Sequence, residues 1–86
     1  MKSTDKYYNM NQDAVFKTQS QIMDAIGYAS EKHHLTMEDI NALGRILAYG
    51  KASGDTSHYE HAVDFLWMAS RIEINHKMLL LDLLEE

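Results

Sequence analysis

Two short stretches of the sequence place a carboxylate and an imidazole three residues apart. Glu31 and His34 form the first pair, and Glu73 and His76 form the second. On a helix, side chains at this spacing share a face, and Glu-x-x-His pairs hold the metals in carboxylate-bridged di-iron bundles. All four residues are therefore candidate metal ligands. The bridging glutamates that further helices supply in such bundles are missing, so a second copy of the chain would have to provide ligands.

Two further histidines, His58 and His61, form another candidate metal site. His58 and His61 flank Glu60, and imidazoles three residues apart on a helix can share a zinc or nickel ion. The alternative interpretation is structural: histidines at helix ends or in a core are satisfied by backbone groups or water. No nucleophile, oxyanion donor or substrate pocket is indicated by the sequence, so we expect neither an enzyme nor a bound cofactor.

Composition excludes several classes of partner and chemistry. The 86 residues carry a formal charge of -5 and no cysteine, which disfavours phosphate backbones and anionic membranes and removes disulfides and thiolate metal sites. The Lys and Arg residues are scattered, so no basic stripe forms. No apolar run reaches the ~20 residues of a membrane span, and residues 1–10 lack the apolar core of a signal peptide. We therefore expect a cytoplasmic protein that binds neither nucleic acid nor membranes.

The elements that would position these residues are all helical. Proline is absent and glycine occurs four times, so little interrupts a helix-friendly sequence. We predict a single helical domain over residues 1–86, with a flexible N-terminal segment at 1–9 and helices at about 10–32, 37–51 and 58–85. The fold class is all-α, an antiparallel three-helix bundle with a long C-terminal helix.

The first two predicted helices have start signals and an apolar stripe. Asn9 or Asn11 can cap the first, and Thr36 and Asp39 have the spacing of a capping box at the second, where Leu35 and Ile40 can pack as a hydrophobic staple. One face of each helix is apolar. The residues that we expect to face the core are Val15, Ile22, Ile26 and Ala29 on the first helix and Ile40, Leu43 and Leu47, beside Gly44, on the second.

The third predicted helix is long for a chain of this size. It opens at a second capping-box pattern, Ser57 with Glu60, and no glycine or proline follows before Glu86. At 1.5 Å per residue, ~28 residues would extend about 42 Å, roughly twice the second helix. If this range forms one continuous helix, we expect a single stripe of its residues to face the core. Its members are Phe65, Ala69, Ile72 and Leu79.

The end of that helix is apolar on nearly every side. Residues 78–84 contain five leucines and Met78 around a single Asp82, and a patch of this kind usually marks a protein interface. We therefore expect oligomerisation to complete the bundle. The alternatives are a tail that folds back over the core as a separate short helix, or a long first helix that covers the apolar end. The expected interface residues are Trp67, Met68, Ile74, Met78, Leu80, Leu81 and Leu84.

These patterns favour a non-enzymatic function. We expect an oligomeric α-helical interaction protein, such as a small regulator or inhibitor of the kind that phages and plasmids encode, which binds a partner protein. The competing hypothesis is a helical bundle that binds a metal or small ligand through Glu31, His34, Glu73 and His76.

Overall fold

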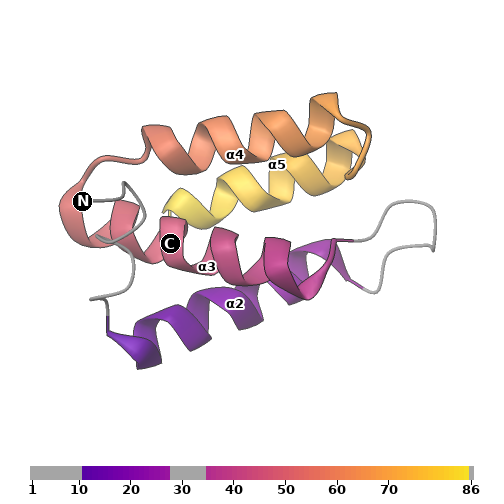
Figure 1. The fold of residues 1–86 in the computed structure, drawn as a ribbon. Helices are drawn as coiled ribbons and strands as arrows, with labels where there is room; N and C mark the ends of the chain where they lie inside the picture. The colour runs from indigo at the N-terminus through magenta and orange to yellow at the C-terminus, as the bar shows by residue number, and fades with distance from the viewer. Residues whose placement is uncertain (1–10, 28–34, 86) are drawn as a thin grey trace.

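The computed structural model describes residues 11–27 and 35–85, and within them every regular element is helical. The elements are α2 (Gln12–Ile26), α3 (Met37–Ser53), α4 (Ser57–Met68), α5 (Ile74–Asp82) and a short 3₁₀ helix, η1 (Leu83–Glu85) (Figure 1). The all-α prediction is confirmed. The three-helix prediction is wrong, because four α-helices lie in the described part of the chain. None of them is long and apolar enough to cross a bilayer.

Helix α2 begins at the predicted cap. Asn11 Oδ1 accepts hydrogen bonds from the backbone N–H groups of Asp13 (2.8 Å) and Ala14 (3.3 Å), two of the donors that a helix start leaves unpaired. The stripe predicted on this helix is buried as far as Ile26. Gly27 then takes a positive φ of 64°, which ends α2. The predicted continuation to residue 32, with Ala29, lies outside the described residues.

Helix α3 also begins as predicted. Thr36 Oγ1 accepts from the Asp39 N–H, and Asp39 Oδ2 accepts from the Thr36 N–H, each over 3.1 Å. This reciprocal pair is the predicted capping box. Leu35 and Ile40, the predicted staple, are both buried. Gly54 closes the helix in the left-handed region at φ 82°, a conformation that glycine adopts without steric cost.

Helices α2 and α3 meet closely at Gly44. Thr18, the one buried polar residue described, donates from Oγ1 to the Gly44 carbonyl over 2.9 Å. A Cβ added at Gly44 would lie 2.5 Å from Cγ of Gln19, so a larger residue here would require the Gln19 side chain to move. The close approach that Gly44 suggested is therefore present.

Helix α4 starts one residue earlier than its predicted capping box. Thr56 is the N-cap residue, and Ser57 is already helical. Asp55 Oδ1 accepts from the Ser57 N–H (3.2 Å) and hydroxyl (2.7 Å), while Glu60 accepts from the Thr56 hydroxyl (3.1 Å). The prediction that Ser57 is the N-cap is wrong. The Asp55 carboxylate accepts the hydrogen bond from the Ser57 N–H, and Ser57 belongs to the first turn of the helix.

The long third helix is also corrected. The α-helix that was predicted over 58–85 ends at Met68, and a second helix, α5, starts at Ile74 and runs back along α4 (Figure 1). The stripe drawn for one continuous helix is therefore wrong in phase: Phe65 is 66% exposed and Leu79 is 46% exposed. Of its members only Ile72 is buried. The residues that do face the core are Tyr59, Val63 and Leu66 before the turn, and Leu80 and Leu83 after it.

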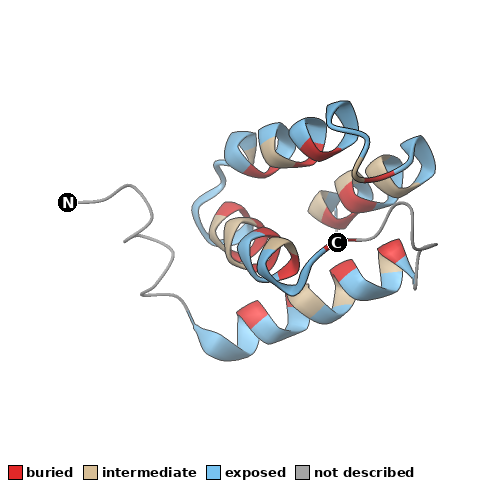
Figure 2. Cartoon of the chain, turned by 45° about the vertical axis from the view of Figure 1, so that its right-hand side comes forward, coloured by how far each residue is buried: buried red, intermediate tan, exposed pale blue. Residues whose placement is uncertain are grey.

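The four helices share one hydrophobic core. Helix α3 packs against α2 and α4, and α5 contacts α2 and α4 in turn, so their buried faces point inward together (Figure 2). Tyr59 and Leu80 are both fully buried, and the Tyr59 hydroxyl donates to the Leu80 carbonyl over 2.8 Å. Burial raises the pKa of the Tyr59 phenol well above its usual range. This contact joins the first turn of α4 to the last turns of α5.

Candidate interaction surface

The turn between α4 and α5, residues 69–73, has the hydrogen bonds of a Schellman motif. The Ser70 N–H donates to the Trp67 carbonyl (3.0 Å), and the Arg71 N–H donates to the Leu66 carbonyl (2.9 Å). Ser70 takes the left-handed conformation at φ 59°. Glycine usually fills this position because it has no Cβ. A serine there left no glycine signal in the sequence, which is why the turn was missed.

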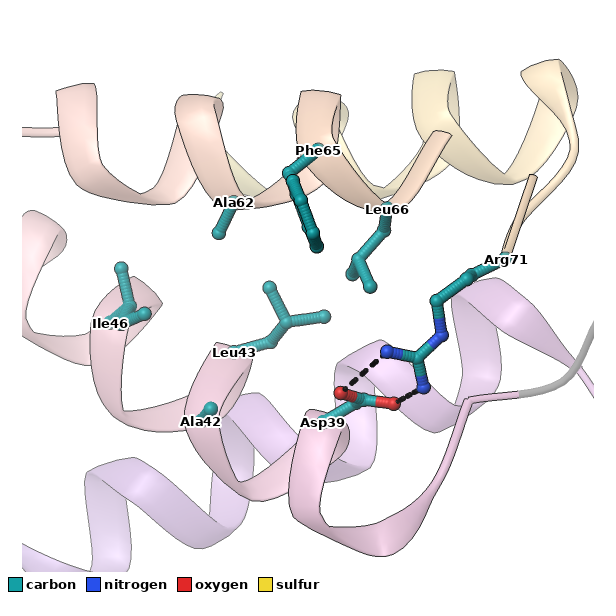
Figure 3. Close-up of a pocket in the computed structure, with 8 residues that line it drawn as sticks. All are labelled: Asp39, Ala42, Leu43, Ile46, Ala62, Phe65, Leu66 and Arg71. Carbon is teal, nitrogen blue, oxygen red and sulfur yellow. Dashed lines mark hydrogen bonds and ion pairs between the residues drawn. The ribbon is translucent and has the colours of Figure 1, made fainter. Parts of the chain in front are cut away.

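An ion pair fixes this turn to the start of α3. Both terminal nitrogens of the Arg71 guanidinium contact the two carboxylate oxygens of Asp39 (Figure 3). Paired donors that match both carboxylate oxygens are geometrically specific. The same carboxylate accepts from the Thr36 N–H in the capping box. Asp39 therefore stabilises two features at once, the start of α3 and the position of the α4–α5 turn.

A second set of contacts fixes the outer side of the α4–α5 pair. Lys77 Nζ lies 2.7 Å from Asp64 Oδ1 and 4.0 Å from the centroid of the Trp67 ring. The ammonium therefore bonds to a carboxylate and lies over an aromatic face, where the ring quadrupole attracts cations. Trp67 comes from α4 and Lys77 from α5, so the contact holds the indole against the neighbouring helix.

Beside this contact lies an exposed apolar surface, which we call the hairpin face. Its residues belong to the end of α4 and the outer side of α5, and the exposed fractions are substantial: Trp67 39%, Met68 77%, Ile74 52% and Met78 61%. Met and Trp are enriched at protein interfaces, because the thioether adapts in shape and the indole buries a large area. The hairpin face therefore has the residue composition of a protein interface.

The structure divides the seven predicted interface residues. Four form the hairpin face, and two, Leu81 and Leu84, are half-buried against the core. Leu80 is fully buried inside the chain, so its assignment to an interface is wrong. Residues 78–84 belong to α5 and η1, and two of their leucines fill the core that the other helices leave open. This packing resembles the alternative in which the tail folds back over the core.

A small groove lies on the other side of α4. Its volume is about 210 Å³, its walls come from α3 and α4, and the Asp39–Arg71 pair closes one end (Figure 3). Phe65 and Leu66 reach from α4 toward Leu43 on α3 (Figure 3). The walls are almost wholly apolar, and the charged groups at the end are already engaged with each other. The groove continues the apolar surface of α4 and presents no group that points to a chemical reaction.

Two of the four candidate metal ligands, Glu73 and His76, lie among the described residues. Glu31 and His34 lie outside the described residues, so the structure does not place them against Glu73 and His76. Glu73 is exposed and precedes α5, and His76 is half-buried. The Nδ1 atom of His76 is buried and has no hydrogen-bond partner. The four-residue metal site therefore stays a prediction.

The other histidines are placed more fully. His58 and His61 are exposed on α4 rather than facing the core. His58 Nε2 lies 3.9 Å from Asp55 Oδ2, and its ring meets Tyr49 edge to face at 6.4 Å between centroids. Across residues 11–27 and 35–85, no three His, Asp or Glu side chains are grouped so that they could hold a metal ion. The structural interpretation suits His58.

Sequence reasoning missed the Arg71–Asp39 pair and the Lys77 contact with Asp64 and Trp67. A continuous helix over 58–85 would have kept Asp64 and Trp67 apart from Lys77. A signal of the break was nonetheless present: the buried stripe of α4 would continue at positions 70 and 73, where the sequence has Ser and Glu. Comparison with protein families, with curated proteins and with solved structures found no match.

Proposed function

We propose that this chain is a non-enzymatic α-helical interaction protein that binds a partner protein through the hairpin face. The observation that carries the proposal is the exposure of four large apolar side chains around a turn that two ion pairs hold in place. A preorganised apolar surface loses little conformational entropy on binding, which favours affinity. Occupying a partner's surface in this way suits a small regulator or inhibitor.

The charges around the hairpin face indicate the chemistry of the partner. Three carboxylates border it along the chain: Asp64 lies one turn before Trp67 on α4, Glu73 directly precedes Ile74, and Asp82 lies one turn after Met78 on α5. Lys77 lies among them, and its ammonium is held by Asp64 and Trp67. The border is therefore acidic overall, as is the whole chain with its net charge of -5. We infer that the partner presents an amphipathic helix whose apolar stripe is flanked by Lys or Arg.

The burial of two C-terminal leucines weakens the basis on which the sequence predicted a homo-oligomer. The predicted homo-oligomer depended on leucines that one chain could not cover, yet Leu80 and Leu83 are buried within it. Two acidic-bordered faces would also repel each other on direct contact. The hairpin face is thus better suited to a basic partner than to a second identical face.

Trp67 makes the proposal testable by fluorescence, because it is the only tryptophan in the chain. The probe is a synthetic amphipathic helical peptide with leucines on one face and flanking lysines, compared with the same peptide flanked by glutamates. We expect a blue shift of Trp67 emission and at least about tenfold tighter binding of the lysine peptide at low salt, with the preference reduced by added salt.

Two methionines provide a matched pair of variants. Met78 in the hairpin face and Met37 at the start of α3 are each 61% exposed. Met78→Ser should weaken the lysine peptide about fivefold, because burying part of a Met side chain contributes roughly 1 kcal/mol. Met37→Ser should leave its affinity unchanged. Equal binding of both peptides, equal effects of the two variants, or no binding at millimolar peptide would each contradict the proposal.

A further inference from the structure

The α4–α5 turn is strained and is made of residues that suit a helix. No glycine or proline occurs from Ser57 to Glu85, and Ser70 is the one described non-glycine residue at positive φ. An L-residue pays a steric cost in this conformation, whereas a helix would remove it. What opposes straightening is tertiary: the Arg71–Asp39 pair and the burial of Ile72 at 2% exposure.

We propose that residues 69–73 are a hinge through which two copies of this chain exchange α5. In the exchanged form each chain runs as one helix from Ser57 to Asp82, which at 1.5 Å per residue is about 39 Å long. Its α5 leaves its own chain and enters the corresponding place in the second copy. Short strained connections are the usual hinges of such domain swapping.

The geometry of the closed chain permits this exchange. Because α5 returns along α4 (Figure 1), two straightened helices can lie antiparallel, with α4 of each chain beside α5 of the other. A two-fold axis then passes through the hinge. The Tyr59–Leu80 hydrogen bond and the Asp64–Lys77 ion pair form again between chains. The contacts of α5 with α2 form again in the same way.

Only the contacts of the hinge itself differ between the two forms. Exchange gives up the Arg71–Asp39 pair and the core position of Ile72. It replaces the Schellman hydrogen bonds of Ser70 and Arg71 with helical ones through residues 69–73, and it relieves the strain at Ser70. Association also costs translational and rotational freedom. The chain should therefore be closed and monomeric when dilute and exchanged when concentrated. This inference does not rest on the proposed function, since it uses the core of the chain rather than the hairpin face.

Ser70 allows the equilibrium to be shifted in both directions. Ser70→Gly relieves the turn and weakens the helix, whereas Ser70→Ala favours the helix and keeps the strain of the turn. Both effects act in each of the two chains of the dimer. The dimer dissociation constant of Ser70→Gly should therefore be about 1000-fold higher than that of Ser70→Ala, as measured by light scattering. Ser20 is an exposed serine within α2, so Ser20→Gly and Ser20→Ala provide the control pair and should leave the constant unchanged.

A distance within one chain distinguishes exchange from any other dimer. His61 and Asp82 are exposed, and spin labels on His61→Cys and Asp82→Cys report whether α4 and α5 are folded together. In a straight helix the 21-residue separation is about 31 Å, whereas neighbouring helices hold the labels roughly 10–20 Å apart. The labelled chain is diluted into excess unlabelled protein, so that only distances within a chain are seen.

The expected result is a short distance in dilute protein and the long distance in concentrated Ser70→Ala protein, with the long form suppressed by Ser70→Gly. A dimer that keeps the short distance overturns the proposal, because the copies then pair without exchange. Ser70→Ala protein that remains monomeric up to about millimolar concentration overturns it too. Either result leaves binding at the hairpin face unaffected.

Discussion

Two adjacent leucines test whether the end of the chain folds into its own core. Leu80 is fully buried and Leu79 is 46% exposed, although both lie on α5 and have the same side chain. If α5 is part of the core of a single chain, Leu80→Ala should cost about 3 kcal/mol, within the range for fully buried leucines, because it removes contacts and leaves a cavity. Leu79→Ala should cost roughly 1 kcal/mol or less, in proportion to the smaller area that it buries.

The assay is urea unfolding followed by Trp67 fluorescence and by helical circular dichroism. With a urea m-value of about 1–2 kcal/mol/M for a small domain, a loss of about 3 kcal/mol lowers the urea midpoint by roughly 1.5–3 M, so the difference between the two variants is easily resolved. The measurement is repeated at two dilute protein concentrations. A core within one chain predicts the same loss at both, because no association is involved.

The reasoning would be refuted by equal losses in the two variants, since equal losses mean that Leu80 is no more buried than Leu79. It would also be refuted by a Leu80→Ala effect that grows with dilution. That result would show that Leu80 is covered by a second chain, as the sequence alone had suggested.

Three further predictions follow from individual contacts. Arg71→Gln should lower the free energy of unfolding by about 1 kcal/mol, because the Asp39 carboxylate loses a bidentate partner. The loss should be smaller in high salt, because the pair is partly exposed. An effect that does not depend on salt in urea titrations would argue against an ionic contribution. Gly44→Ala should destabilise by about 1 kcal/mol, since overpacking against Gln19 outweighs the gain in helix propensity, and a more stable variant would show that the Gln19 side chain can move aside. The folded-state pKa of Tyr59 lies above its unfolded value, so its contribution to stability is present below about pH 10 and is lost as the pH rises further; Tyr59→Phe should lack this component, and identical alkaline unfolding curves for the two proteins would contradict the burial of the phenol.

The local start signals could be predicted from the sequence. Thr36 and Asp39 form their capping box within four residues, and Asn11 caps α2 through donors two and three residues away. Because these interactions need no tertiary partner, spacing alone was sufficient to predict them. The inward residues of α2 and α3 followed from the helical period for the same reason.

The turn after α4 could not be predicted in the same way. Ser70 holds a left-handed conformation that serine does not favour, and it does so because Arg71 finds Asp39 and Ile72 enters the core. Those partners lie on other helices, so tertiary contacts override local helix propensity at this point. A single stripe drawn across the missed turn was wrong on both sides of it, since Phe65 before the turn and Leu79 after it are both exposed.

The position of this stripe explains why the predicted interface residues differ in exposure. Continuing one helical wheel through residue 85 placed Leu79 inside, and Leu80 was assigned to an interface, whereas the structure reverses both positions. Trp67 and Met78 remained correctly exposed, because the outer side of a hairpin stays outside whichever helix carries it. The apolar surface could therefore be anticipated, but its arrangement around a turn could not.

The most direct test of the reversal at residues 69–73 is an NMR measurement on isotopically labelled protein, dilute enough to be monomeric. A reversed chain predicts nuclear Overhauser contacts between the Tyr59 ring and Leu80, together with a positive φ at Ser70 from its backbone coupling constant. Helical chemical shifts that continue without interruption from Ser57 to Asp82, with no Tyr59–Leu80 contact, would contradict both the hairpin face and the hinge.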